Sequence, residues 1–315
     1  MKTGIIATIG FFDGVHKGHQ SLIRDLVHEA SVRGLRSMVI TFDRHPREVF
    51  APNDVPLLLT TNEEKICLLK QCGVDEIHVL RFDPSLAALS AFDFMRIVLR
   101  DELVVSALLV GYDHRFGKPM MVPVRQDVSD AELRPEAFED YRHYGQELGI
   151  DVLQAQEWDG GSHVSSSVVR KALINGDMER ANAALGHFYT LSGEVVHGHN
   201  IGHRLGFPTA NIQMVNARKL IPLGGVYAAW ADVNGVNRVP TMVNIGRRPT
   251  FSGTDVSIEA HLLHFDSDLY GQEVTLSFVS RIRGERRFAS EDELRRQLAL
   301  DQAYTGELLN SVPTP

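Results

Sequence analysis

The sequence predicts an α/β domain with a mainly parallel, doubly wound sheet, followed by an all-β domain that forms an antiparallel barrel or sandwich with a closing helix. The first prediction rests on apolar runs of strand length that alternate with segments at helical spacing as far as Gly186. The second rests on short β-like segments from Tyr189 onward, which Gly and Pro turns separate with no helix between them. The 315 residues therefore divide into domains over 1–186 and 187–315, each long enough to bury its own core.

Apolar runs bounded by charge or by turn residues predict the strands of the first domain: Ile5–Ile9, Arg36–Phe42, Ile77–Leu80, Ala107–Gly111 and Val152–Ala155. Helices are predicted directly after the first strand and over Thr61–Cys72, Phe92–Leu99, Pro135–Leu148 and Ser165–Gly176. In doubly wound sheets, ligands bind beyond the carboxyl ends of the strands, at a topological switch point. Polar loops follow most of these strand ends, so we expect them to form one site.

The strands predicted for the second domain are Tyr189–Val196, Val226–Val233, Val239–Val243, Val256–Leu263 and Val274–Ser280. A capping box, Ser290-Glu291-Asp292-Glu293, then opens a helix whose apolar positions include Leu294, Leu298 and Leu308. This helix is expected to close the domain.

The composition excludes several classes of protein. A net charge of −8 argues against a general nucleic-acid binder, since affinity for the phosphate backbone needs clustered Lys and Arg. No apolar run reaches membrane-spanning length, so no membrane association is expected. Cys67 and Cys72 lie five residues apart in a predicted helix, which suits buried thiols better than a disulfide or a metal pair. We expect a cytoplasmic protein.

The first motif is Gly10-Phe11-Phe12-Asp13-Gly14-Val15-His16-Lys17-Gly18-His19, between the first strand and the first helix. Glycines in the turn let the backbone approach a ligand, and the N-terminus of the helix favours anions. His16 and His19 lie three residues apart, so both can face one phosphate group. Fixed donors of this kind stabilise the charge that develops in nucleotidyl transfer. A plain strand–turn–helix corner with solvated histidines is the alternative.

A second motif, Ser165-Ser166-Ser167-Val168-Val169-Arg170, places hydroxyl groups at a helix start and an arginine one turn later. Hydroxyl and backbone N–H groups can hold phosphate oxygens, and Arg170 can neutralise developing charge. An ordinary serine cap with a surface arginine is the alternative.

The histidine motif resembles the G-x-F-D-G-x-H-x-G-H signature of nucleotidyltransferases related to the class I aminoacyl-tRNA synthetases. Its Phe-Asp-Gly version resembles the FAD synthetase half of the bifunctional bacterial riboflavin kinase/FAD synthetases. The serine motif resembles the I-S-S-T-x-I-R element of that family, with Val164 and Ser167 in place of Ile and Thr. The resemblance implies a Rossmann-like domain in which His16, His19 and Arg170 are catalytic. It also implies nucleotide-binding roles for Gly10, Phe11, Asp13, Gly14, Ser166 and Ser167.

Two further loops of the first domain resemble family elements with one departure each. Gly111–Lys118 resembles G-x-D/N-F-x-F-G with His114 in place of Phe, and it makes Asp113 a flavin-binding candidate. Phe42-Asp43-Arg44-His45-Pro46 resembles F-D-P-H-P with Arg44 in place of Pro.

The most specific stretch of the second domain is Gly193–Asn211, which is rich in glycine and ends in Pro208-Thr209-Ala210-Asn211. Backbone amides of such a loop can wrap phosphates. The alternatives are a glycine-rich turn region and a metal site formed by His197, His199 and His203.

The run Pro208–Asn211 resembles the P-T-A-N signature of riboflavin kinases, which implies an antiparallel β-barrel. By this resemblance Thr209 and Asn211 help to hold Mg²⁺, an ion that prefers oxygen ligands. The nucleotide-binding candidates are Gly198, Gly202, Gly206 and Pro208. His203 stands where the family often has arginine.

The resemblance continues at Asn244-Ile245-Gly246-Arg247-Arg248-Pro249-Thr250-Phe251. Its flavin-binding candidates are Asn244, Gly246, Pro249 and Thr250. The kinase's general base is implied at Glu259, where the apolar alternation of the strand puts Glu259 and His261 on the polar face. A solvated surface carboxylate is the alternative.

Taken together, these motifs predict an enzyme that phosphorylates riboflavin to FMN with ATP and then adenylylates FMN with ATP to FAD and pyrophosphate. The expected ligands are riboflavin, FMN, FAD and ATP, with Mg²⁺ as the cofactor. One alternative is another H-x-G-H nucleotidyltransferase, which would not need the second domain. The other is a flavin- or nucleotide-binding protein without catalytic activity.

Overall fold

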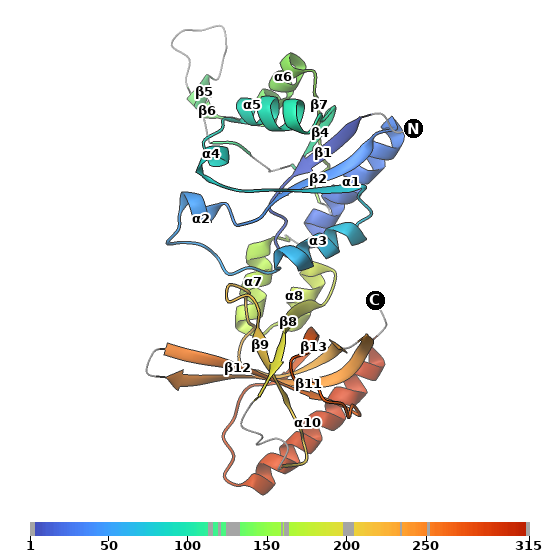
Figure 1. The fold of residues 1–315 in the computed structure, drawn as a ribbon, viewed down its shortest axis with the longest axis vertical. Coiled ribbons are helices and arrows are strands. Elements are labelled where there is room, and N and C mark those ends of the chain that lie inside the picture. The colour runs from blue at the N-terminus through green and yellow to red at the C-terminus, as the bar shows by residue number, and fades with distance from the viewer. Residues whose placement is uncertain are drawn as a thin grey trace. The chain divides into compact units, whose positions relative to one another are not determined.

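The first part of the chain forms a five-stranded parallel sheet in the order β3-β2-β1-β4-β7 (Figure 1). Its strands are β1 (Ile5–Ile9), β2 (Arg36–Phe42), β3 (Glu76–Leu80), β4 (Ala107–Val110) and β7 (Asp151–Gln154). The computed structural model describes residues 4–112, 116–118, 121–123, 133–158, 160, 164–197, 205–233, 235–250 and 253–312. The predicted parallel sheet is confirmed. Strand order reverses between β1 and β4, so the carboxyl ends of these two strands flank the topological switch point.

Both faces of this sheet are buried at its three central strands, β2, β1 and β4. These strands are nearly continuous apolar runs, and their side chains point alternately to the two faces. Ile5, Ala7 and Ile9 of β1 join one apolar cluster, and Ile6 joins the other. The covering helices are α1 (Lys17–Arg33), α2 (Arg47–Phe50), α3 (Asn62–Gln71), α4 (Pro84–Ala87), α5 (Ala91–Phe94) with the π-helical η1 (Met95–Glu102), and α6 (Phe138–Leu148). Ile23 and Leu26 of α1 pack in the second cluster, which fixes the helix that follows the histidine motif.

One helix start was predicted wrongly. Pro135 is not at the beginning of a helix, because it ends β6 (Leu133–Pro135), which pairs with β5 (Met121–Pro123) in a two-stranded sheet. The helix α6 begins at Phe138, where the Asp140 carboxylate accepts a hydrogen bond from the N–H of Ala137 at 2.8 Å.

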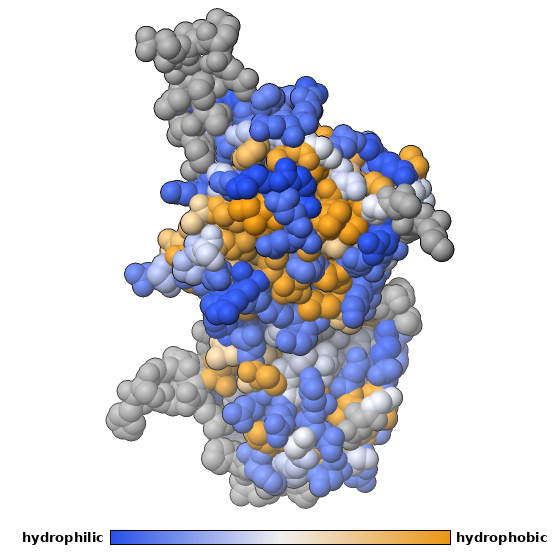
Figure 2. All heavy atoms as spheres, turned by 45° about the horizontal axis from the view of Figure 1, so that its top comes forward, coloured by the Kyte–Doolittle hydropathy of each residue, from blue (hydrophilic) through white to orange (hydrophobic). Residues whose placement is uncertain are grey.

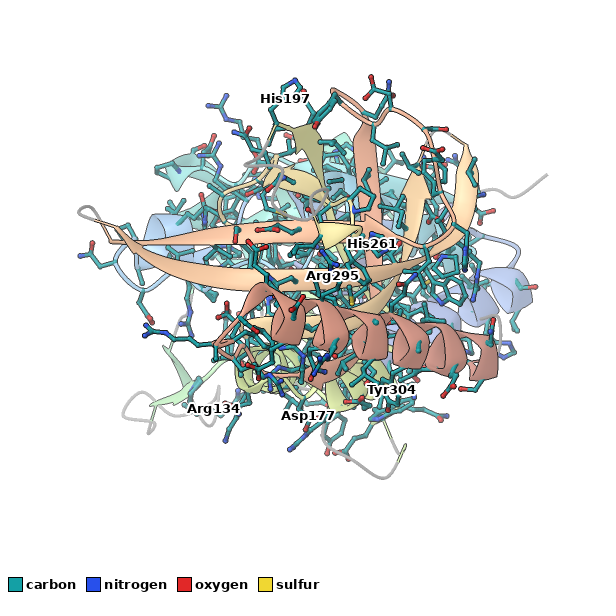
Figure 3. The ribbon with its side chains drawn as sticks, turned by 90° about the horizontal axis from the view of Figure 1, so that it is seen from below. Arg134, Asp177, His197, His261, Arg295 and Tyr304 are labelled. Carbon is teal, nitrogen blue, oxygen red and sulfur yellow. The ribbon has the colours of Figure 1, made fainter. Side chains whose placement is uncertain are left out.

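The second part of the chain is a closed barrel in the order β10-β11-β12-β9-β8-β13, which confirms the barrel and excludes the sandwich. Its strands are β8 (Tyr189–Val196), β9 (Ala210–Met214), β10 (Gly225–Val233), β11 (Val236–Thr250), β12 (Gly253–Leu262) and β13 (Glu273–Arg283). All of their pairings are antiparallel. The predicted closing helix is α10 (Glu291–Ser311), which Ser290 caps and which packs on β10, β11 and β13. Figure 3 shows α10 beside the barrel strands, with Arg295 and Tyr304 labelled on it.

Two helices that precede the barrel also pack on it. These are α7 (Ser166–Asn175) and α8 (Met178–Leu185). The Asn182 amide donates to the carbonyl oxygen of Phe278 at 2.9 Å, and its oxygen accepts from the N–H of Tyr189 at 2.9 Å. The N–H of Leu223 donates to the carbonyl oxygen of Leu173 at 3.0 Å. These bonds tie both helices to the barrel.

By contacts the chain separates into two compact units, residues 1–163 and 164–315. This division lies before the boundary predicted at residue 186, because α7 and α8 pack with the barrel. Residues 1–186 were predicted to carry the adenylyl transfer and residues 187–315 the riboflavin kinase reaction, and this functional boundary remains a prediction.

Figure 2 shows a largely polar surface, with apolar residues gathered on part of the first unit. Among the described residues, no helix is long and apolar enough to cross a membrane.

Candidate functional site

The loop after β1 is held in place by its own aspartate. The Asp13 carboxylate, in a residue that is 3% exposed, accepts hydrogen bonds from the backbone N–H groups of Leu59 and Thr60 at 2.9 and 3.0 Å. The Thr60 hydroxyl donates to the same carboxylate at 3.2 Å and accepts from the N–H of Gly14 at 3.1 Å. The side chain of Asp13 therefore holds the loop in place through hydrogen bonds inside the protein; we call this arrangement the Asp13 clamp. If Asp13 contacts the nucleotide, as the sequence predicts, it would do so through its backbone.

The backbone of this loop is strained. Phe12 has φ +55° and the β-branched Val15 has φ +40°, both in the left-handed region. Such residues cost about 1–3 kcal/mol each and cluster at functional sites. Gly10 is required as well, because a Cβ there would lie 2.8 Å from the Phe12 ring.

His16 and His19 lie together at the N-terminus of α1. His16 is the N-cap residue, and its Nδ1 accepts a hydrogen bond from the backbone N–H of His19 at 3.4 Å. Because Nδ1 accepts, the proton of the neutral ring is on Nε2, where it can be donated to a ligand. The two rings are stacked, and the Phe12 ring meets His19 edge-on with centroids 5.1 Å apart. The structure thus places two imidazoles and a helix N-terminus beside the switch point.

The element Phe42–Pro46 follows β2 at the same edge of the sheet. The carboxylate of Asp43 accepts from the N–H of Phe82 at 2.8 Å, and the Asn62 amide donates to the carbonyl oxygen of Asp43 at 2.6 Å. Arg44, the departure from the family pattern, is exposed and lies 3.5 Å from the Asp43 carboxylate. Asp113 and His114 of the other loop lie outside the described residues.

The serine motif opens α7. Ser165 is the N-cap residue, and its hydroxyl accepts from the N–H of Val168 at 3.3 Å. The hydroxyl groups of Ser166 and Ser167 are therefore not required for capping. Ser166 and Arg170 are four residues apart and share one face of the helix. This helix belongs to the second unit by its contacts, and the role of its hydroxyl groups and Arg170 in phosphate binding remains a proposal.

The candidate residues of the barrel form a row across three strands. In the register of the sheet, Asn244 of β11 lies opposite Glu259 of β12, and Glu259 lies opposite Asn211 of β9. All three line a hollow of about 640 Å³, as does Thr209. Glu259 is half-buried. The structure thus brings together four residues that the sequence analysis singled out from segments far apart in the chain.

The turn that leads into β9 is fixed by His261. This histidine is 7% exposed, and its Nδ1 lies 2.7 Å from the carbonyl oxygen of Pro208. A carbonyl oxygen only accepts, so Nδ1 carries the proton. Figure 3 labels His261 among the barrel strands. The sequence alternation put His261 on the same face as Glu259 without giving it a role, and in the structure it contacts the backbone next to Thr209.

Other candidates are placed with less detail. Gly206 has φ +85°, which favours glycine, and Pro208 is exposed. Gly246 pairs with Ser257, and a Cβ there would lie 2.9 Å from the Ser257 hydroxyl. Pro249 and Thr250 belong to β11, but their side chains lie outside the described part of the structure. The described residues do not include Gly198, Gly202 and His203.

A second hollow, of about 240 Å³, lies beside the same turn. Its lining includes Pro208, Thr209, Leu269 and Tyr270, so Thr209 borders both hollows. The ring of His197 stacks on Tyr270 with centroids 3.8 Å apart. Within the described residues, no group of three or more His, Cys, Asp or Glu side chains is arranged to hold a metal ion. His199 of the alternative histidine site lies outside them.

No motif in the sequence indicates the residues that form one wall of the larger hollow. They lie at the end of β13, in the loop after it and on α10: Arg283, Glu285, Arg286, Phe288, Leu294 and Leu298. The Arg283 guanidinium pairs with the Asp301 carboxylate of α10, with Nη2 and Oδ2 2.7 Å apart, and Asp301 is 2% exposed. The Arg286 guanidinium lies 4.6 Å from the centroid of the Phe288 ring. A charged run before a capping box is typical of a solvated loop, so only the apolar Phe288 within it could have signalled a site.

Comparison with known proteins gives a consistent result for both units. The family model described as FAD synthetase matches residues 1–168, and the one described as riboflavin kinase matches residues 185–309. The chain is similar to a bifunctional riboflavin kinase/FMN adenylyltransferase of Escherichia coli (strain K12), with 40% identity over 307 residues that cover 97% of this chain and 93% of that protein. A protein of the same description from Bacillus subtilis (strain 168) is 34% identical over 301 residues, 94% of this chain and 90% of that one.

One solved structure is similar over nearly the whole chain. It is described as a macrolide-efflux protein from Streptococcus pneumoniae, and it is 28% identical with a TM-score of 0.83 over 97% of this chain and 95% of that one. The fold of both units is therefore shared with a structure solved by crystallography.

Proposed function

The chain belongs to the family of bifunctional riboflavin kinase/FMN adenylyltransferases, and from this premise we propose which of its residues carry each reaction. The enzyme phosphorylates riboflavin to FMN with ATP, and it adenylylates FMN with ATP to give FAD and pyrophosphate. The observation that supports the assignment of residues best is the row Asn244, Glu259 and Asn211 across the wall of the larger hollow.

In the kinase reaction, riboflavin occupies the larger hollow, and its ribityl 5′-hydroxyl points at Glu259. The carboxylate accepts the hydroxyl proton as the oxygen forms a bond to the γ-phosphorus of ATP, and ADP leaves. Asn244 is a hydrogen-bonding neighbour of the flavin. The smaller hollow beside Tyr270 receives the nucleotide, because Thr209 borders both hollows and so lies between the two substrates.

Thr209 and Asn211 are proposed to hold Mg²⁺. Hydroxyl and amide oxygens beside a carboxylate are a donor set that suits this ion. Mg²⁺ bound there would neutralise charge on the transferred phosphoryl group. His261 keeps Thr209 in place through its bond to the carbonyl oxygen of Pro208.

In the adenylyl transfer, an oxygen of the FMN phosphate attacks the α-phosphorus of ATP, and pyrophosphate leaves. His16 donates from Nε2 to a phosphate oxygen, and His19 and the N-terminus of α1 hold the same negative charge. Gly10, Phe11 and Gly14 supply the close backbone approach to the nucleotide. Ser166, Ser167 and Arg170 of α7 are proposed to bind phosphate oxygens in this reaction. Cys67 is exposed and Cys72 half-buried, so the expectation of two buried thiols is wrong. Both are free thiols, which is in keeping with a cytoplasmic enzyme.

One incubation tests this proposal. The purified chain with riboflavin, ATP and Mg²⁺ should form FMN and then FAD, as read by chromatography, and removal of Mg²⁺ with a chelator should stop both. Parallel incubations with pantetheine phosphate or nicotinamide mononucleotide should give no adenylylated product. Binding of flavin without any product would favour the inactive binding protein. Adenylylation of another phosphate ester in preference to FMN would favour a different nucleotidyltransferase.

A further inference from the structure

Lys65 is a buried lysine at the junction of α3, β2 and the loop after β1. It is 1% exposed, and its ammonium donates a hydrogen bond to the carbonyl oxygen of Phe42 at 2.8 Å. The same ammonium lies 4.3 Å from the centroid of the Phe11 ring. In the sequence alone, Lys65 is only one residue of the helix predicted over Thr61–Cys72.

The charge is costly where it lies. An ammonium has three N–H donors, and among the described residues only the carbonyl oxygen of Phe42 accepts a hydrogen bond from Lys65. Burial lowers the pKa of Lys65 to about 8, although the charges of Asp13, Asp43 and Glu63 act in the opposite direction. A buried charge with one acceptor is expensive, and an apolar side chain of the same length would avoid the cost. A lysine at this buried position therefore points to a use for its charge.

The ring that Lys65 contacts belongs to the adenylyl-transfer loop. Phe11 follows Gly10 in the histidine motif, and its carbonyl oxygen accepts from the Thr41 hydroxyl at 3.1 Å. Its ring meets that of His45 edge-on, with centroids 4.8 Å apart. The attraction between a cation and the face of an aromatic ring is strongest where both are removed from water. Lys65 thus fixes the Phe11 ring from the protein interior.

Other contacts of α3 act at the same place. Asn62, in its first turn, donates to the carbonyl oxygen of Asp43, and Leu59 and Thr60, just before the helix, hold the Asp13 carboxylate. The start of α3 therefore contacts both the end of β2 and the loop after β1. Among the described residues, Lys65 is the one cationic side chain of α3 that contacts the loop after β1.

We propose that Lys65 is a positioning residue for FMN adenylylation, which acts through the Phe11 ring to hold the loop that carries His16 and His19. This inference rests on the role proposed above for that loop. A neutral amine is not attracted to the ring face, so the contact weakens as the pH rises through about 8. The charged or titratable groups that face Lys65 from the surrounding elements are Asp13, Asp43 and Glu63, and His45 adjoins the Phe11 ring. FMN adenylylation should decline above this pH, and riboflavin phosphorylation should not share the decline.

The test is Lys65→Met, which removes the charge and keeps the length of the side chain. At pH 7 the variant should adenylylate FMN at least about tenfold more slowly. This is the rate change expected when the free energy of roughly one buried cation–π contact is lost. It should lack the decline above pH 8. Riboflavin phosphorylation by the same molecules should stay within about twofold of the parent, and a urea titration of the first unit checks that the variant folds. Lys70→Met, an exposed lysine of the same helix, is the matched control and should change neither reaction.

Phe11→Leu supplies the second arm. Because Lys65 acts through the ring, Phe11→Leu should also remove the decline above pH 8, and the double variant should be no slower than the slower single variant. Parental adenylylation by a Lys65→Met protein that phosphorylates riboflavin normally would overturn the inference, and so would multiplying effects in the double variant. If Lys65→Met does not fold, Phe11→Leu alone decides: adenylylation that still declines above pH 8 in this variant would overturn the inference. If His19→Ala also keeps parental adenylylation, the role of the loop itself is wrong, which is a separate failure.

Discussion

The imidazole rings of His16 and His19 lie stacked, with centroids 3.6 Å apart and planes inclined by 19°. The stacking follows from the local fold, because His16 caps α1 while His19 occupies its first turn. A ring held by a cap and by a neighbouring ring loses little freedom when a phosphate binds. Preorganised donors of this kind are the most effective means of stabilising developing charge.

Replacement of His19 by Ala should therefore reduce FAD formation from FMN by roughly 10²–10³, the usual cost of one such donor. FMN formation from riboflavin should continue, since the kinase residues lie in the other unit. Chromatography of both products from one incubation measures the two rates. His28→Ala, an exposed histidine of the same helix, is the control. FAD formation at the parental rate in the His19 variant would remove this motif from the site.

Glu259→Gln should give the reciprocal result. The amide keeps the size of the side chain but cannot accept the hydroxyl proton, so riboflavin phosphorylation should fall by about 10²–10³. FAD formation from added FMN should be unchanged. Glu273→Gln, an exposed glutamate of β13, provides the comparison. Unimpaired phosphorylation by the folded Glu259 variant would exclude this carboxylate as the base.

The bonds of Asp13 predict an effect on stability. Asp13→Ala leaves the N–H groups of Leu59 and Thr60 without their acceptor, and hydrogen bonds to a charged group contribute about 1.5–3 kcal/mol each. We expect the first unit to lose about 3 kcal/mol of unfolding free energy in urea titrations. Asp54→Ala, at a carboxylate that is 82% exposed, should change it little. An equal effect of both substitutions would show that the clamp is not a stabilising contact.

The pair formed by Arg283 and Asp301 should matter for both stability and substrate binding. Asp301→Ala leaves a largely buried guanidinium unpaired, which costs about 3–5 kcal/mol. Because Arg283 lines the larger hollow, the KM for riboflavin should rise as well. Asp292→Ala, exposed in the first turn of α10, is the control for thermal melting and kinetics. A parental KM in a destabilised Asp301 variant would limit the role of the pair to folding.

A fragment of the second unit should keep the kinase activity. Residues 187–315 contain every kinase candidate, and from the sequence they are expected to fold and phosphorylate riboflavin. The fragment 164–315 should be more stable, because it keeps α7, α8 and the bonds of Asn182. Circular dichroism, thermal melting and an FMN assay on both fragments measure this. Equal melting temperatures would mean that these helices add nothing to the barrel, and a folded 164–315 without activity would mean that the kinase needs the first unit.

The sequence was sufficient for most of the fold, and the reasons for the errors are physical. Tyr189–Val196 was predicted with its observed bounds, because buried residues alternate along it with half-buried or exposed ones. The strand β9 was not predicted, since it is short and begins only two residues after Pro208. Pro135 was misplaced at a helix start because proline suits that position as well as the end of a short strand.

The sequence likewise predicted one part of the candidate site and not another. Motifs singled out His16, Thr209 and Asn211 as candidates. The resemblance to the family singled out Glu259, because the spacing of its strand alone is also typical of a solvated surface carboxylate. The clamp at Asp13 and the contact of Lys65 with Phe11 join segments that are distant in sequence, so no local pattern signals them. The register that puts Asn244, Glu259 and Asn211 in one row is likewise a property of the closed barrel.

The pairing of β9 with β12 has a consequence for motion. It extends over only two registered pairs among the described residues, Glu259 with Asn211 and Ala260 with Ala210. Separation of these strands would break few hydrogen bonds, so the barrel should open locally there at a lower free energy than along its longer pairings. Amide hydrogens at this seam should exchange with solvent faster than those of β10. Riboflavin and nucleotide bound across the seam would raise the free energy of opening, so slower exchange at Asn211 and Glu259 would report their binding.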